Sequence, residues 1–210
     1  MNEKMLVTEG LNELKTLNAR IMRDIQKAEF IVGAKNVEKN AKPGKTKEDF
    51  SKEAKASMQS IEDLIARRER IKAAIIASNA VTEVEIAGQK MTVAKAIETK
   101  DSITYKQMLL EIMEEQYKKA VELVDKKNRA VDEKIDDLVA TAYGKEGKEK
   151  VSENDYEAIA KPYKAANEYG FVDPLDLKKR IDDLHSFIDE FKSTVDSKLQ
   201  ISNCITVIEI

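Results

Sequence analysis

Few residues of this chain have side chains suited to catalysis or ligand binding, and the first of them lie in a lysine-rich loop. The run Gly44-Lys45-Thr46 resembles the end of a P-loop, in which a glycine-rich backbone and a lysine hold nucleotide phosphates. That motif needs a glycine five positions before Gly44, and Lys39 stands there. It also follows a strand, whereas a helical pattern precedes this loop. We therefore expect a solvated loop over 33–47, with anion binding by its lysines as the alternative.

His185 is the only histidine and Cys204 the only cysteine. Asp182 precedes His185 by three residues, the spacing of the carboxylate–histidine elements in di-iron helical bundles. Such a centre needs two of these elements, so one histidine does not form it. Cys204 falls in a predicted strand with nothing to bring it to His185, so no nucleophile–base pair is expected. We predict no catalytic residues, no cofactor, no metal site and no enzymatic activity.

The composition is that of long helices rather than of a globular enzyme. Charged residues make up 36% of the 210 residues, aromatic residues only 5%, and tryptophan is absent. With a net charge of −3, the chain as a whole does not attract polyanions electrostatically, so we expect no specific nucleic-acid partner. The longest unbroken apolar run, Ala73–Ala77, is far shorter than a membrane span. The N-terminal sequence lacks the apolar region of a signal peptide, and one cysteine does not form an internal disulfide. We therefore expect a cytoplasmic location during synthesis.

Apolar residues spaced three and four apart predict the helices. The long ones are expected over about 4–32, 47–78, 105–142 and 174–200. Shorter helices are expected over 93–100 and 153–169, and Pro162 should kink or divide the second of these. The short loop between the first two long helices favours an antiparallel hairpin.

Three polar residues fall on the apolar stripes of these helices: Asn18, Arg68 and Lys127. Polar residues at such positions can fix the register or oligomeric state of paired helices at a cost in stability. The alternative is an ordinary interruption of the stripe. For Arg68 we expect an ion pair between helices, with Glu114 or Asp136 as its partner.

The chain contains an internal repeat, because residues 75–86 match residues 199–210. In both copies a helical pattern reaches Ser-Asn and then becomes a β-branched run, so we predict a long helix followed by a short strand, used twice. The identical pairs are Ser78/Ser202, Asn79/Asn203, Thr82/Thr206, Glu85/Glu209 and Ile86/Ile210.

The strands of this repeat provide the only interface that we predict. Residues 81–86 and 90–93 should form a hairpin through Gly88, which can adopt the positive φ of a tight turn. We expect 204–210 to join it in a three-stranded sheet that caps the helices. This sheet should contact a neighbouring subunit, by strand addition at its edge or by packing of its apolar face, and the alternative is that the chain's own helix ends cover that face. The predicted interface residues are Val81, Val84, Ile86, Ile205, Val207, Ile208 and Ile210.

Short motifs in the same region resemble the septicolysin-like family of small bacterial and phage helical proteins. The motifs are I-x-x-S-N-A-V-T and M-T-V-A-K-A-I, and the resemblance covers most of the chain. It implies a helical bundle and provides no catalytic residues. The matching residues are Arg70, Ser78, Asn79, Thr82, Thr92, Ala94 and Ala96, with Asn203 and Thr206 near the C-terminus.

Together these patterns predict a mainly α fold, an elongated antiparallel bundle of coiled-coil hairpins with a small three-stranded β cap. We expect one domain over 1–210, made of two hairpin halves at about 1–93 and 94–210. The predicted function is that of a non-enzymatic structural or assembly protein in a homo-oligomer or larger multimer. The charged, tryptophan-free sequence resembles phage virion proteins of the tail, baseplate, neck or capsid, which gives the virion as a location. The alternative is a cytosolic helical adaptor or chaperone-like binding protein.

Overall fold

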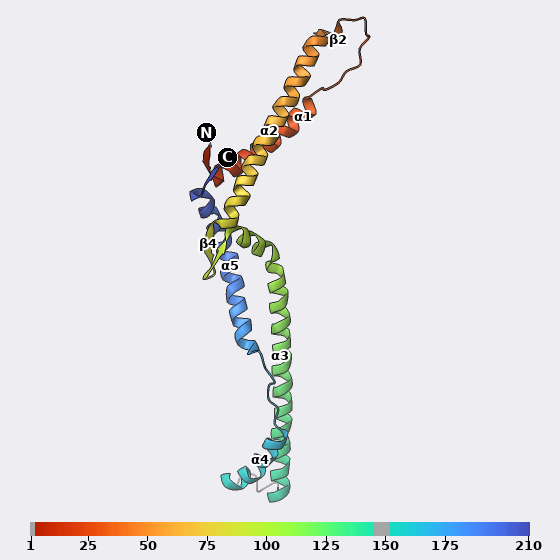
Figure 1. Ribbon diagram of the computed structural model, residues 1–210. Coiled ribbons are helices and arrows are strands. Elements are labelled where there is room, and N and C mark those ends of the chain that lie inside the picture. The colour runs from red at the N-terminus through yellow and green to blue at the C-terminus, as the bar shows by residue number, and fades with distance from the viewer. Residues whose placement is uncertain (1–2, 145–151) are drawn as a thin grey trace. The chain divides into compact units, whose positions relative to one another are not determined.

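The computed structural model describes residues 3–144 and 152–210 and is mainly α-helical (Figure 1). None of the described helices is long and apolar enough to span a membrane. The helices are α1 (Val7–Lys27), α2 (Lys47–Val81), α3 (Val93–Tyr143), α4 (Glu153–Asn167) and α5 (Leu177–Ile205). The strands are β1 (Lys4–Leu6), β2 (Asn40–Lys42), β3 (Lys45–Thr46), β4 (Glu83–Ile86), β5 (Gln89–Thr92) and β6 (Val207–Glu209).

The chain forms two compact units. The first unit contains Met1–Asp101 together with Glu190–Ile210, and the second contains Ser102–Asp189. Segments from both ends of the sequence therefore belong to one unit. The expected single domain with halves at 1–93 and 94–210 stays a prediction.

In the first unit, α1 and α2 pack against each other, and the chain between them reverses direction over residues 28–46. The hydroxyl of Thr46 accepts the N–H of Asp49 at 3.1 Å, as the predicted cap of α2 requires. Apolar side chains of α1, α2 and β6 form one core cluster of this unit. They are Val7, Leu14, Leu17, Ile21, Ile71, Ile75 and Ile208.

Helix α3 corrects the prediction of separate helices over 93–100 and 105–142, because it is continuous from Val93 to Tyr143. Thr104 and Gln107 have the spacing of a capping box, but both lie inside α3. The sequence from Val93 to Tyr143 contains no glycine or proline, so nothing in it ends a helix. Capping residues favour a helix start but do not by themselves impose one.

The structure also corrects the bounds of the other helices. Helix α1 begins at Val7 rather than at residue 4, because the preceding residues form β1. Helices α2 and α5 run three and five residues past their predicted ends, to Val81 and Ile205. Helix α4 continues through Pro162 and is not divided there.

The prediction of a three-stranded cap is wrong, because the described strands form three separate two-stranded antiparallel sheets. Strand β4 pairs with β5 across the turn at Ala87-Gly88, where Gly88 has φ +67°. Strand β6 pairs with β1 rather than with this hairpin. The cause is that residues 4–6, predicted as helical, are extended and present their backbone groups to β6.

The two copies of the repeat end their helices in the same way. The N–H of Thr82 donates to the carbonyl oxygen of Ser78 at 2.8 Å, and the N–H of Thr206 donates to that of Ser202 at 3.0 Å. Each threonine is followed by a strand, β4 or β6. The helix-to-strand transition therefore falls at the same position in both copies.

The equivalence extends to the strands that β4 and β6 pair with. Val84 faces Met91 in one sheet, and Ile208 faces Met5 in the other. The next pairs along are Glu85 with Lys90 and Glu209 with Lys4.

Residues 89–93 (Q-K-M-T-V) thus correspond to residues 3–7 (E-K-M-L-V), and both segments lead into a helix. A unit of helix, two strands and helix occurs twice. In one copy, a tight turn connects the strands. In the other copy, they come from opposite ends of the sequence (Figure 1).

Candidate contact surface

The seven predicted interface residues fall into two groups. Val81, Ile205 and Val207 are exposed, with 76%, 72% and 56% of their surface accessible. Ile86 and Ile208 are almost fully buried, and Val84 and Ile210 are half-buried. The predicted surface is therefore reduced to residues at the helix ends and at the start of β6.

Ile208 is buried because it packs against α1 at Gly10, which has no side chain. A Cβ atom on Gly10 would lie 3.4 Å from Cδ1 of Ile208 and 3.3 Å from Cγ2 of Ile71. The missing side chain lets β6 and α2 approach the backbone of α1 closely. Ile208 thus contributes to the core of its own chain, which agrees with the alternative that the chain covers its own strands.

The exposed residues belong to the last turns of two equivalent helices. Residues 77–81 of α2 and residues 201–205 of α5 are termed here the twin helix ends. Each twin helix end has exposed, uncharged residues at spacings of three and four, which share one face of the helix. No charged residue occurs between 73 and 82 or between 199 and 208. The equivalent pairs of the two copies are Ala77/Ile201, Ala80/Cys204 and Val81/Ile205.

Arg67 of α2 joins three elements of the first unit. Its Nη1 and Nη2 donate to the two carboxylate oxygens of Glu3, at 2.9 and 3.1 Å. Its Nε and Nη2 donate to Glu13 on α1, the second at 3.0 Å. Two such forked pairs on one guanidinium are geometrically specific. They raise the pKa of Arg67, with Glu13 the larger cause, and the bond from Arg67 lowers the pKa of Glu3.

Arg67 was recognisable as one of a cluster of arginines, but its partners were not. Glu3 lies 64 residues away and Glu13 lies 54 residues away, and no local spacing connects them. Arg68 also differs from its prediction, because its Nε donates to Oδ1 of Asn18 at 2.5 Å. The partner of Arg68 is therefore another polar residue of the predicted stripes, rather than Glu114 or Asp136.

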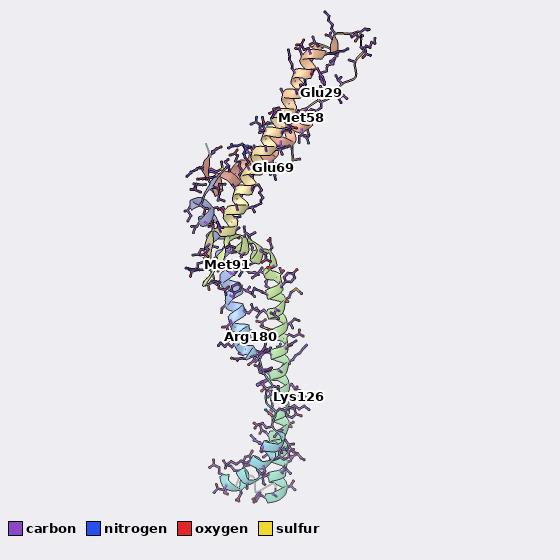
Figure 2. All side chains as sticks on the ribbon, viewed as in Figure 1. Glu29, Met58, Glu69, Met91, Lys126 and Arg180 are labelled. Carbon is purple, nitrogen blue, oxygen red and sulfur yellow. The ribbon has the colours of Figure 1, made fainter. Side chains whose placement is uncertain are left out.

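The lysine-rich loop contains a small hairpin of β2 and β3, and Lys42, Lys45 and Lys47 have partners within the chain. Lys42 pairs with Glu29, labelled in Figure 2, and lowers the pKa of that carboxyl group. Lys45 pairs with Glu53, and Nζ of Lys47 donates to the carbonyl oxygen of Lys35 at 2.6 Å. These contacts engage the ammonium groups of Lys42, Lys45 and Lys47 without an external anion. Anion binding by the loop stays a prediction.

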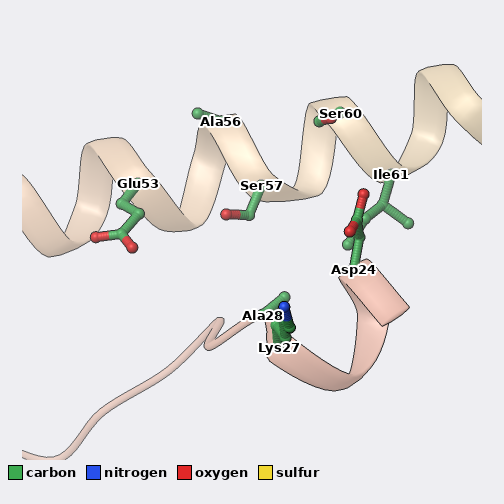
Figure 3. A pocket seen from close by; sticks show the side chains of 8 residues that line it. All are labelled: Asp24, Lys27, Ala28, Glu53, Ala56, Ser57, Ser60 and Ile61. Atoms are coloured by element: carbon green, nitrogen blue, oxygen red, sulfur yellow. The ribbon is translucent and has the colours of Figure 1, made fainter. Parts of the chain in front are cut away.

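A recess of about 430 Å³ lies between the end of α1 and the middle of α2 (Figure 3). Small side chains on α2 (Ala56, Ser57 and Ser60) leave this space open. The two carboxylates at its edges are already engaged, because Asp24 pairs with Arg23 at 3.1 Å and Glu53 pairs with Lys45. No histidine or cysteine lines the recess.

The residues considered for metal or nucleophilic chemistry are dispersed. Nδ1 of His185 lies 3.1 Å from Asp189, and Asp182 pairs with Lys178 instead. Cys204 is exposed on α5. Within the described ranges, no three or more histidine, cysteine, aspartate or glutamate side chains form a group that could hold a metal ion.

A second exposed apolar face, which the sequence patterns did not indicate, lies on α3 in the second unit. Its residues follow the spacing i, i+3, i+4, i+7, and each has more than half of its surface accessible. A regular helical spacing was visible in the sequence, but spacing does not distinguish a buried stripe from an exposed one. The residues of this face are Tyr105, Met108, Leu109 and Ile112.

No known family model matches the chain, and comparisons with curated proteins and with solved structures find no match. The resemblance to the septicolysin-like family stays a prediction based on short motifs.

Proposed function

We propose that this chain is a non-enzymatic structural or assembly protein that acts as part of a multimer. The observation that carries the proposal is the pair of twin helix ends. Each exposes an uncharged apolar face at an equivalent position of the repeat. Two uncharged apolar faces are not expected by chance on a chain in which 36% of the residues are charged.

The repeat supports this proposal, because an exposed β-branched residue stands at the same position of both copies. Burial accounts for Val7 and Val93, which begin equivalent helices at 2% exposure each. Packing within the chain does not account for the β-branched pair Val81 and Ile205, because both side chains extend into solvent. A contact with another protein at both sites explains why an apolar residue stands at each.

In its most concrete form, the proposal is a phage virion component, such as a tail, baseplate, neck or capsid-associated protein. Its support is the charged, heptad-rich sequence without tryptophan. Such assemblies repeat one chain many times, and a chain with two equivalent contact faces can bind two neighbours.

The test replaces Val81 and Ile205 together by Asp and measures the mass by light scattering after size exclusion. Two buried carboxylates at a contact are costly, so the multimer should dissociate while the helical circular dichroism signal is retained. Val37→Asp is the matched control, because Val37 is 92% exposed and lies outside the repeat. An unchanged mass of the double variant would contradict the proposal that the twin helix ends are contacts between subunits.

The alternative, a monomeric adaptor or chaperone-like binding protein, is favoured by the apolar face of α3. Tyr105, Met108, Leu109 and Ile112 have the spacing of anchors by which a helix docks into an apolar groove of one partner. If the unmodified chain is a monomer, Met108→Asp should abolish partner capture. If the unmodified chain is a multimer and Met108→Asp does not change its mass, the assembly proposal is favoured.

A further inference from the structure

A second recess, of about 200 Å³, lies in the second unit between α3 and the segment that leads into α5. Its walls include Leu123 and Val124 of α3, together with Tyr169 and Phe171 of the segment. All of its lining residues belong to one compact unit, so its shape does not depend on how the two units are placed.

Aromatic rings are concentrated at this recess. The chain has six tyrosines and five phenylalanines, and three of these line it: Tyr117, Tyr169 and Phe171. The rings of Tyr117 and Phe171 are inclined by 15°, with centroids 6.4 Å apart. The faces of aromatic rings carry partial negative charge and attract cations.

The segment that carries two of these rings is held firmly against α3. The side chain of Asn128 donates to the carbonyl oxygen of Tyr169 at 3.0 Å and accepts its N–H at 2.8 Å. The carboxylate of Asp173 accepts the N–H groups of Leu175 and Leu177, at 3.1 and 2.8 Å. These bonds fix the walls before any ligand arrives, which reduces the entropy cost of binding.

The charge around the recess favours a cation. Asp173 is the one charged residue in its lining, and residues 165–177 contain three carboxylates and no basic residue. Of the nearby basic groups, Lys178 pairs with Asp182 at 2.8 Å and Nε of Arg180 donates to the carbonyl oxygen of Leu175. The ammonium group of Lys127 lies against the ring of Tyr169, so the rings of Tyr117 and Phe171 are the ones left to an external cation.

Within the chain, the ring of Tyr169 already contacts an ammonium group, that of Lys127. Nζ of Lys127 lies 5.7 Å from the centre of the Tyr169 ring, within the range of a cation–π contact.

We infer that this recess binds an alkylammonium cation between its aromatic rings and the carboxylate of Asp173. Its volume is below that of pockets for drug-sized ligands, so it suits a small quaternary ammonium or one lysine side chain. The inference is independent of the proposed assembly function, because the twin helix ends belong to the other unit.

The test titrates the full chain with choline and with its neutral isostere, 3,3-dimethylbutan-1-ol, at constant ionic strength. Tyrosine fluorescence, which no tryptophan masks, reports binding, and the NMR shifts of Tyr117, Tyr169 and Phe171 locate it at the recess. Choline should bind at least about tenfold more tightly than the isostere, because both the ring faces and the carboxylate of Asp173 attract its charge. Equal binding of the two probes, or no binding of choline, would overturn the inference.

Two variants locate the site. Phe171→Leu retains apolar volume but removes a ring, so choline affinity should fall about tenfold while isostere affinity stays within about twofold. Asp173→Asn retains a good helix cap but removes the charge, so it should weaken choline binding only. Tyr143→Leu, an exposed ring at the end of α3 outside the recess, is the control and should leave both affinities unchanged. Wild-type choline affinity in both Phe171→Leu and Asp173→Asn, with native circular dichroism, would contradict the assignment.

A third probe, acetyl-lysine methylamide with a free side-chain ammonium, separates the two sources of such a cation. Tighter binding of this probe than of choline identifies a lysine of a protein partner, and the reverse identifies a free quaternary ammonium. Displacement of either probe by the other supports one shared cation site, whereas independent binding of the two contradicts it.

Discussion

The N–H of Val7 donates to the carbonyl oxygen of Thr206 at 2.9 Å, so the first helix of the chain begins on the segment that follows its last helix. The N–H of Val93 makes the same bond to Thr82, at 2.8 Å. In both cases a threonine that ends one helix accepts the first N–H of another. A helix start leaves such N–H groups without partners within the helix, and here the repeat provides one of them.

Ile208 is expected to be the most important residue of β6 for stability. It is 4% exposed and contacts the core of α1 and α2, so Ile208→Ala should cost about 2–5 kcal/mol of unfolding free energy. Val207→Ala, one position away and exposed, should cost within about 0.5 kcal/mol. Urea denaturation measures both, and equal costs would contradict the burial of Ile208.

Gly10 should tolerate no branched side chain. Its Cβ position already lies 3.3 to 3.4 Å from three isoleucine side chains, so the larger side chain in Gly10→Val should destabilise the chain by about 1–3 kcal/mol. Gly33→Val is the control, because no atom lies within 4 Å of the Cβ position there. A thermal melt of Gly10→Val at or above the wild-type temperature would show that α1, α2 and β6 are less closely packed than described.

The contact between Glu3 and Arg67 should depend on pH. The bond from Arg67 lowers the pKa of Glu3 in the folded chain, so its stabilisation is complete above the ordinary value of about 4.3. It is lost as the pH falls through the lowered value. Glu3→Gln should therefore reduce the urea midpoint at pH 7, and this difference should disappear in strong acid.

Glu69→Gln, an exposed carboxylate on α2, provides the control for that titration. A difference between wild type and Glu3→Gln that is the same at pH 7 and in strong acid would show that ionisation of Glu3 does not stabilise β1.

Local patterns predicted the helices well, because apolar spacing and caps such as Thr46 act over a few residues. They missed β1, a strand of three residues whose partner lies about 200 residues away in the sequence. Met5, Leu6 and Val7 continue the apolar pattern of α1, so nothing local marks them as extended. The tertiary pairing with β6 overrides the helical preference.

The contact surface was predictable in position but not in detail. The repeat identified the segments around Val81 and Ile205, and these residues are exposed. It did not show that Ile86 and Ile208 turn inward, because their burial depends on which strand each sheet recruits and on Gly10. The recess around Tyr169 was also missed, because Asn128 holds that segment from 41 residues away.

The central claim, that the chain acts in a multimer, is tested most directly by the mass of the unmodified protein. Sedimentation equilibrium over micromolar concentrations should give a mass that rises above the 23.7 kDa of one chain as the concentration increases. A mass of one chain at every concentration would contradict the claim.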